Sequence, residues 1–464
     1  MNSDGKRMRT LIHGGTLVRG DSTTAMGALV LDGGVITDVL DRWDPQHTFD
    51  GETVSASGCL VMPGLVNSHA HGVTGGPFMP SGASPLEEQV WMGNLDRHLL
   101  AGTTTVLNLC GFSGMESVAE ADRRHAVNVR GATTHFPESF RAARLSDGGG
   151  LPSTLSDCGW SAESMVEAGA VAIGELGGGQ TLGGGGQDLV YLPDAIERST
   201  GIRVSPVHAR ELKEAALGRF IDPDLFETGA FAFAAQEAGL SGRIKLADLR
   251  ELVVTTVMPS VEPARNGIRE GVLEAERLGV PAIVHSAAAT RQILLDLMKE
   301  TRNRNVRVIA GHANHASYTP DEALEMAQRG REAGWLNEVS TFDLLYRRQA
   351  VKTRDHWDRL LTEPGLVDTM ATDYGSEGRH DELIGAIQDV VSHGFRTLPD
   401  AVGMATSAAA EAIPGLAPNR GRLERGRIAD IVVTDADDLR DVKFVYIDGI
   451  CVVRNGDITE GAHR

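Results

Sequence analysis

Residues 61–72 read VMPGLVNSHAHG, and this stretch decides which fold and which chemistry we expect. An apolar run ends in His69 and His71, two histidines with one residue between them. Residues two apart on a β-strand point to the same face, so both imidazoles can bind one ion. The alternative is that one histidine packs in the core and the other is solvated. We favour the chelating pair because further residues of metal-ligand type follow later strands.

Downstream of this stretch, apolar runs alternate with amphipathic helical patterns, which is typical of βα units and a parallel sheet. Eight parallel strands joined by helices are best closed as a barrel, so the sequence predicts an α/β fold of the (β/α)8 TIM-barrel type. The predicted strands lie within residues 64–71, 102–109, 131–138, 169–177, 281–287, 306–314, 335–343 and 368–374.

Both ends of the chain have a different pattern, in which short Val, Ile and Leu runs are broken by Gly and Asp. Such runs with turn residues between them indicate antiparallel strands. We expect residues 1–62 and 415–464 to form one accessory β domain together, and residues 63–414 to form the catalytic barrel.

The segment from about residue 178 to residue 260 is too long for a single βα connection. It begins in LGGGQTLGGGGQD (residues 176–188), a Gly-rich run without the G-K-[ST] ending or the G-x-G-x-x-G spacing of phosphate-binding loops. We therefore interpret the run as a flexible loop. The helical patterns after it predict an insertion that lies over the barrel mouth as a lid.

Four later strands end in residues that can bind a metal ion, namely Glu175, His285, His312 and Asp373. A barrel carries its catalytic groups at the carboxyl ends of its strands, so we expect these residues to meet the His-x-His pair. One carboxylate after one apolar strand is a weak signal. Nitrogen and oxygen ligands at five strand ends are a set that suits zinc, iron or manganese.

The segment PGLVNSHAHG (residues 63–72) resembles the first-strand signature of the amidohydrolase superfamily. In that superfamily a His-x-His pair is followed by a bridging residue on the fourth strand, single histidines on the fifth and sixth, and an Asp on the eighth. The segments GRLERGRIADIVVTD (residues 421–435) and GICVVRNG (residues 449–456) resemble its composite β-sandwich. The resemblance spans nearly the whole chain and implies a TIM barrel with a β-sandwich built from both termini.

The resemblance also implies a role for each ligand. His69 and His71 would hold a buried ion, and His285 and His312 would hold a more exposed one. Glu175 would bridge the two ions. A carboxylate can do so because its two oxygens reach ions about 3.5 to 4 Å apart.

Asp373 would both bind metal and carry protons. The implied cofactor is a divalent metal, zinc or else iron or manganese, with one or two ions per subunit. Many relatives form dimers or tetramers, so the resemblance also implies a homo-oligomer.

Two positions depart from the pattern that many superfamily members share. Asn67 stands where Asp is frequent, although Asn is also seen there. Many members bridge their metals with a carboxylated lysine, whereas Glu175 holds that position here and no lysine of the chain ends a predicted strand. The Glu bridge resembles the enamidase and adenine-deaminase branches. It argues against a hydantoinase or a dihydroorotase.

Four further residues are candidates for contact with substrate, namely His208, Arg210, His315 and Tyr374. His208 also follows an apolar stretch and is an alternative to His285 as the fifth-strand ligand. The helical pattern of residues 262–279 leads directly into the strand of His285, as a βα unit requires, and therefore favours His285.

Composition narrows the class of protein further. The 464 residues carry a formal net charge of -19, and no basic stripe is present, so neither nucleic acid nor an anionic membrane is an expected partner. A small, neutral or cationic substrate suits this charge better. No apolar run reaches the roughly 20 residues of a membrane helix, and the N-terminus lacks the apolar stretch of a signal peptide, so we expect a cytoplasmic protein.

These observations predict a metal-dependent hydrolase in which a metal-activated hydroxide attacks the C–N bond of a small cyclic amide or enamide. The alternative is a hydrolytic deaminase that expels ammonia from an aminoheterocycle with the same activated water. A third possibility is a non-catalytic scaffold of the same fold. Loss of ligands would mark such a scaffold, and here every ligand position is filled.

Overall fold

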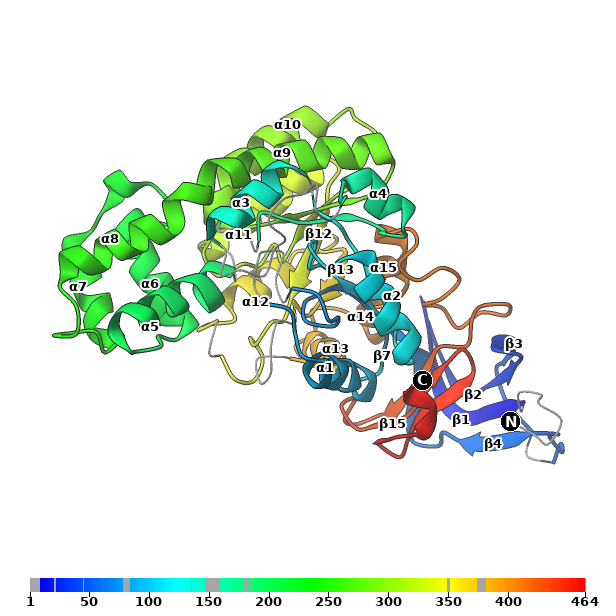
Figure 1. Cartoon of the computed structure of the whole chain (residues 1–464). Helices are drawn as coiled ribbons and strands as arrows, with labels where there is room; N and C mark the ends of the chain where they lie inside the picture. The colour runs from blue at the N-terminus through cyan, green and yellow to red at the C-terminus, as the bar shows by residue number, and fades with distance from the viewer. Residues whose placement is uncertain are drawn as a thin grey trace.

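A computed structural model describes residues 9–20, 22–44, 46–77, 84–134, 136–146, 159–178, 182–183, 186–348, 351–373 and 381–463. The described chain has a β-rich part, made from both ends of the sequence, and a mixed α/β part that carries the candidate ligands (Figure 1). Within these ranges no helix is both long enough and apolar enough to cross a membrane.

The α/β part contains eight parallel strands in two sheets. The first sheet has the order β6-β7-β8, and the second has the order β9-β10-β11-β12-β13. The strands are β6 (Leu65–Ala70), β7 (Thr103–Asn108), β8 (Asn128–Gly131), β9 (Ile173–Leu176), β10 (Ala282–His285), β11 (Val308–Gly311), β12 (Leu336–Ser340) and β13 (Thr369–Ala371).

Backbone contacts join the two sheets at both edges. Between β8 and β9, the amide of Gly174 donates to the carbonyl of Thr133 over 2.7 Å. Between β13 and β6, the amide of Asp373 donates to the carbonyl of His69 over 3.0 Å. The strand order therefore follows the chain through all eight strands, which is the order of a (β/α)8 barrel.

The third predicted strand was placed too late in the sequence. We expected it within residues 131–138, but β8 is Asn128–Gly131, and beyond it only Thr133 makes an isolated bridge among the described residues. The strand begins after the buried apolar residues Ala126 and Val127. Asn128 and Arg130 interrupt this apolar run, so the sequence does not show the pattern of a buried strand. In the structure Arg130 pairs with Asp122.

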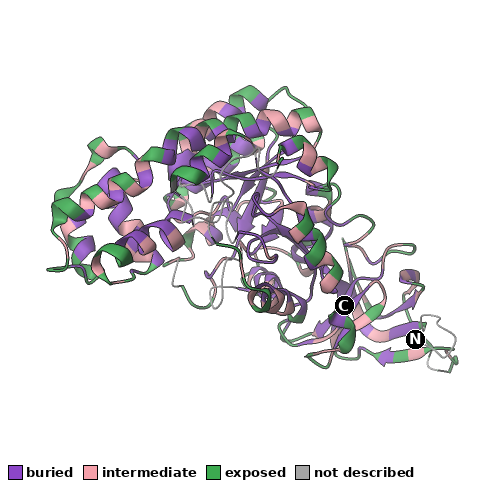
Figure 2. Ribbon diagram, in the orientation of Figure 1, coloured by how far each residue is buried: buried purple, intermediate pink, exposed green. Residues whose placement is uncertain are grey.

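Helices flank the strands and bury one face each, which Figure 2 shows as buried inner and exposed outer surfaces. Helix α9, for example, buries Ile268, Val272 and Ala275, which recur at helical spacing. The helices of this part are α1 (Glu88–Leu100), α2 (Met115–Arg124), α3 (Glu138–Ser146), α4 (Ala162–Glu167), α9 (Val261–Leu278), α10 (Arg291–Thr301), α11 (Pro320–Glu332), α12 (Asp355–Leu361), α13 (Leu383–Ser392), α14 (Leu398–Met404) and α15 (Ser407–Ala412).

The β-rich part is one nine-stranded sheet to which both ends of the chain contribute. Strand β5 pairs antiparallel with β14, so Val61 lies opposite Val433. Both side chains are buried with Ile12 and Leu29 in a separate hydrophobic core. Burial of these apolar side chains stabilises the pairing of the two ends of the chain. The strands are β1 (Thr10–Arg19), β2 (Ser22–Asp32), β3 (Val35–Leu40), β4 (Glu52–Ser55), β5 (Cys59–Pro63), β14 (Ile431–Asp435), β15 (Val442–Ile447), β16 (Ile450–Arg454) and β17 (Asp457–Ile458).

A helical segment separates β9 from α9, in the region where we expected an insertion. Its helices extend to one side of the molecule, drawn in green in Figure 1, and share a core that includes Leu212, Phe231 and Leu249. The Gly-rich run before them falls partly outside the described residues. The segment contains a π-helix (Gly186–Tyr191), α5 (Leu192–Thr200), α6 (Pro206–Leu217), α7 (Thr228–Glu237), α8 (Leu246–Val257) and two short 3-10 helices (Pro223–Leu225 and Met258–Ser260).

Candidate metal centre

The His-x-His pair lies at the carboxyl end of β6, and both side chains are buried. Asn67, two residues earlier, ties this strand to the residues after β13. Its Nδ2 donates to Thr372 Oγ1 over 2.7 Å, and its Oδ1 accepts from the Thr372 amide over 3.2 Å. The amide side chain thus brings Asp373 next to His69 and His71, a role that the sequence did not reveal.

Glu338, from the middle of β12, orients the first histidine of the pair. Its Oε1 lies 2.7 Å from His69 Nδ1, and its Oε2 accepts from the Ser68 hydroxyl over 2.6 Å. A carboxylate at Nδ1 keeps the proton on that nitrogen and leaves the Nε2 lone pair for a metal. His69 Nε2 is buried and has no hydrogen-bond partner among the described residues. Glu338 was not among the predicted site residues, although an acidic residue in the middle of the predicted strand 335–343 is a usable signal.

Glu175, on β9, reaches both pairs of histidines. Its Oε1 lies 2.8 Å from His285 Nδ1 and 2.7 Å from His312 Nε2. Its Oε2 lies 3.8 Å from His71 Nε2 and 4.0 Å from His69 Nε2. One carboxylate oxygen therefore faces each pair, which is the arrangement that a bridging ligand needs.

Asp373 follows β13 with a backbone φ of +49°, in the left-handed region that few non-glycine residues adopt. Its Oδ1 lies 3.3 Å from His71 Nε2 and 3.5 Å from His69 Nε2. The side chain is 24% exposed, whereas the carboxylate of Glu175 is buried. Asp373 is thus the more exposed of these two carboxylates.

All six predicted ligands come together in the structure. Three overlapping groups place their ligand atoms close enough to hold an ion, and they are His69–His312–Asp373, His69–His71–Glu175 and Glu175–His285–His312. These nitrogen and oxygen donors fit zinc, iron or manganese. The buried Nε2 of His69, without a hydrogen-bond partner in the part of the chain that the structure describes, fits a metal-ligand role as well.

The ionisable side chains of the site shift the pKa values of one another. Burial alone would raise the pKa of Glu175, but His285 and His312 outweigh it, so the pKa lies well below its usual range. Burial likewise acts to lower the pKa of His312, but the contact with Glu175 raises it to about 9. For Asp373, the charge of His69 and the contact with His71 overcome burial and lower the pKa. The carboxylates are therefore ionised at neutral pH, as metal ligands must be.

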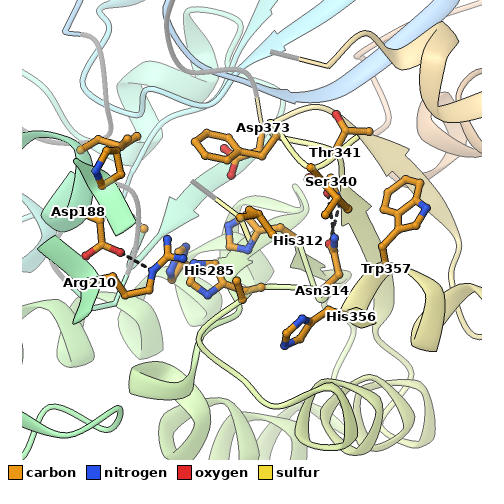
Figure 3. A pocket seen from close by; sticks show the side chains of 18 of the residues that line it. Asp188, Arg210, His285, His312, Asn314, Ser340, Thr341, His356, Trp357 and Asp373 are labelled. Carbon is orange, nitrogen blue, oxygen red and sulfur yellow. Dashed lines mark hydrogen bonds and ion pairs between the residues drawn. The ribbon is translucent and has the colours of Figure 1, made fainter. Parts of the chain in front are cut away.

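A pocket opens over these residues. Figure 3 shows Asp188 and Arg210 at one side, beside His285, with Trp357 at the opposite side. His285, His312 and Asp373 line the pocket together with side chains from the helical segment and from the ends of β11 and β12. The pocket therefore gives a small molecule access to the candidate ligands.

The four candidate substrate residues separate into three groups. Arg210 and His315 line the pocket. Burial, followed by the charges of His285 and His312, lowers the pKa of His315 well below its usual range, so its ring is neutral. His208 lies on α6, half-buried, and is neither at a strand end nor in the pocket lining. Tyr374 lies outside the described residues.

Comparison with known proteins agrees with this geometry. Residues 234–458 match the Amidohydrolase family. A curated dihydroorotase from Syntrophotalea carbinolica is 24% identical over 406 residues, which cover 84% of this chain and 81% of that protein.

Solved structures show the same fold at low sequence identity. A beta-aspartyl dipeptidase from Fervidobacterium islandicum is 14% identical, with a TM-score of 0.57 and 98% of each chain covered. An L-hydantoinase from Arthrobacter aurescens is 16% identical, with a TM-score of 0.51 and 98% of each chain covered. The family match over residues 234–458 and the curated relative support a metal-dependent amidohydrolase enzyme. The solved structures show the shared fold.

Proposed function

We propose that this protein hydrolyses the C–N bond of a small cyclic amide or enamide, with one or two divalent metal ions that would be held by His69, His71, Glu175, His285, His312 and Asp373. The observation that carries the proposal is the position of the Glu175 carboxylate, with one oxygen facing His285 and His312 and the other facing His69 and His71. Dihydroorotase and L-hydantoinase act on cyclic amides, and their similarity to this chain supports the same class of substrate.

The eight strands would form a closed (β/α)8 barrel in residues 63–414, with an accessory β domain from residues 1–62 and 415–464 and an insertion at about 178–260. In this arrangement all six ligands lie at one end of the barrel, which is where such folds carry their active sites. The helical insertion would then form one wall of the substrate pocket, since Asp188 and Arg210 line it.

Divalent ions held by these residues would lower the pKa of bound water towards about 7 and polarise a carbonyl group. The protein side chains supply the remaining steps. Asp373, whose Oδ1 faces His69 and His71, takes a proton from the attacking water and delivers it to the departing nitrogen of the substrate, as a general base and then a general acid. Glu338 holds His69 in the tautomer that presents Nε2, and the neutral ring of His315 forms part of the wall beside the substrate.

A dihydroorotase relative also bears on which branch this chain resembles. We argued from the Glu bridge for an enamidase or adenine-deaminase type of enzyme, and that branch stays a prediction. The curated relative is a dihydroorotase. At 24% identity, this chain can act on a cyclic substrate other than that of the relative. Ring opening and ammonia release are therefore the two reactions that an assay must separate.

The test combines metal analysis with a substrate panel. The purified enzyme is expected to contain up to two divalent ions per chain and to open at least one ring among lactams, cyclic ureides and cyclic imides. Release of ammonia from an aminoheterocycle without ring opening would instead establish the deaminase.

Glu175→Gln preserves the size of the side chain but removes the bridging charge, so it is expected to lose one ion or most of the activity. Glu163→Gln, at an exposed position on α4, is the matched control. If Glu175→Gln keeps the metal content and activity of the wild type, then another residue bridges.

A further inference from the structure

The second histidine of the His-x-His pair contacts a cysteine on the neighbouring strand. Cys110 Sγ lies 3.5 Å from His71 Nδ1, a distance at which sulfur can form a hydrogen bond. Cys110 is a free cysteine and is fully buried, and His71 is 1% exposed. The contact is therefore shielded from bulk water.

The pairing of β6 with β7 brings these two residues together. Ala70 lies opposite Asn108 in the register, and the Leu109 amide donates to the Ala70 carbonyl over 2.8 Å. His71 follows Ala70 and Cys110 follows Leu109, so both side chains leave the chain at adjacent strand ends. The parallel pairing of the two strands thus sets the distance between the sulfur and the imidazole.

The other ring nitrogen of His71 faces the candidate metal ligands. Nε2 lies 3.3 Å from Asp373 Oδ1 and 3.8 Å from Glu175 Oε2. A metal ion at Nε2 needs the lone pair of that nitrogen, so the neutral ring must carry its proton on Nδ1. The sulfur beside Nδ1 can accept the hydrogen bond of this proton, although sulfur is a weak acceptor.

We propose that Cys110 is a positioning residue, which accepts a hydrogen bond from His71 Nδ1 and so presents Nε2 to a metal ion. Cys110 is not part of the pocket lining, so it acts through His71 and not on the substrate. The inference rests on the metal centre of the proposed function, but metal binding is measured without turnover of any substrate.

The two histidines of the pair would then be oriented by different kinds of acceptor. Glu338 holds His69 Nδ1 with a carboxylate oxygen at 2.7 Å, whereas the sulfur of Cys110 lies 3.5 Å from His71. A carboxylate at Nδ1 raises the basicity of the ligand nitrogen, and a weak acceptor does so less. Loss of the sulfur is therefore expected to weaken metal binding by less than a full loss of the contact between Glu338 and His69.

A buried cysteine also fills space, so the test must separate orientation from packing. Ala at position 110 removes the acceptor and stays apolar, whereas Ser keeps an acceptor of nearly the same shape but buries a hydroxyl. If Cys110 only packs, Ala should be tolerated at least as well as Ser. If Cys110 orients His71, Ser should bind metal more tightly than Ala.

The experiment measures the Zn²⁺ affinity of the full chain by competition with a chromophoric chelator. Cys110→Ala should weaken binding by about 10-fold, the lower end of the range for a partner of a ligand histidine, and Cys110→Ser by less than about threefold. Cys59→Ala and Cys59→Ser, at a half-buried position on β5, are the matched controls and should bind Zn²⁺ like the wild type. Circular dichroism checks that every variant is folded.

A second measurement reports the tautomer directly and needs no variant for its main result. In nitrogen-15 NMR of the histidine-labelled, Zn²⁺-loaded wild type, His71 should show a protonated Nδ1 that exchanges slowly with solvent. The signal of this N–H group should shift in both Cys110 variants and stay unchanged in both Cys59 variants. A purely structural role of the cysteine would not move it selectively.

The inference is overturned if Cys110→Ala binds Zn²⁺ like the wild type, if Cys110→Ser weakens binding as much as Cys110→Ala, or if Nδ1 of His71 carries no proton in the loaded wild type. Its failure is distinct from that of the proposed function. Ring opening with a Zn²⁺ affinity that does not depend on Cys110 removes only the inference. Zn²⁺ binding that depends on Cys110, with no ring opened, supports the inference and removes the proposed reaction.

Discussion

At the scale of single residues, the candidate site depends on which nitrogen of each histidine carries the proton. Glu338 at Nδ1 of His69 leaves Nε2 for an ion. His71 presents its Nε2 to Glu175 and Asp373, while its Nδ1 lies 3.5 Å from Cys110 Sγ. Small changes in these contacts are therefore expected to alter metal binding before they alter the fold.

Glu338→Gln is expected to weaken metal binding by about 10- to 100-fold, because an amide orients His69 without supplying the negative charge that raises its basicity. Competition with a chromophoric chelator measures the affinity. Glu332→Gln, at an exposed position on α11, is the control and should bind metal like the wild type. Unchanged affinity in Glu338→Gln would show that Glu338 serves only to pack β12.

Asp373→Asn keeps a weak oxygen ligand and nearly the same volume, so the metal content and the fold should largely survive. The amide cannot accept the proton, and kcat should fall by at least about 100-fold, with a smaller effect on KM. The acidic limb of the pH–rate profile should change as well, because it reports protonation of this carboxylate or a group coupled to it. Normal kcat with an unaltered profile would require a different proton carrier.

At the scale of elements, the ligands are held where strands end and the chain turns. His312 and Asp373 both adopt positive φ just after β11 and β13. Gly178, in the turn after β9, lies so close to Glu175 that a Cβ atom at this position would clash with the carboxylate. The path of the backbone therefore limits the space for the Glu175 carboxylate on one side.

Gly178→Ala tests this close approach. The added methyl group should displace the Glu175 carboxylate, and we expect loss of one ion and most of the activity while the far-ultraviolet circular dichroism stays native. Gly229→Ala on α7 is the matched control, since a methyl group added there would project into open space. A fully active Gly178→Ala enzyme would show that this turn adjusts freely.

At the scale of the whole molecule, stability also depends on buried groups that do not line the pocket. His98 on α1 is buried, and burial, followed by the charges of His125 and Arg97, lowers its pKa to about 3. Its ordinary value is about 6.5, so the unfolded chain binds a proton below that pH whereas the folded chain does not. The contribution of His98 to stability is therefore present above about pH 6.5 and is lost as the pH falls.

This linkage predicts a slope of up to about 1.4 kcal/mol per pH unit between about pH 6.5 and about pH 3. His98→Gln does not titrate, so its unfolding temperature should fall less than that of the wild type between about pH 7 and about pH 5. His47→Gln, whose parent side chain is 72% exposed, should behave like the wild type. Equal losses in all three proteins would mean that other groups account for the acid sensitivity.

Much of the site was predictable because its signals are local. A pair of histidines at strand spacing can be recognised from its neighbours along the chain, and so can a single ligand residue after an apolar run. All six residues come together in the structure. The same holds for the long helical segment before α9. The predicted position of β8 was wrong. The polar residues Asn128 and Arg130 interrupt its buried apolar residues and obscure the apolar pattern of a strand.

Contacts between distant segments arise only in the folded chain. Glu338 reaches His69 across 269 residues of sequence, and Asn67 reaches Thr372 across 305. Asp188 and Arg210 become part of the pocket only when the helical segment packs against the strand ends. Residue type and periodicity establish which side chains can bind metal, because both are local properties of the chain. Folding establishes how Glu175 lies between the two pairs of histidines and how Glu338 contacts His69, because these contacts depend on the distances between segments far apart in the chain.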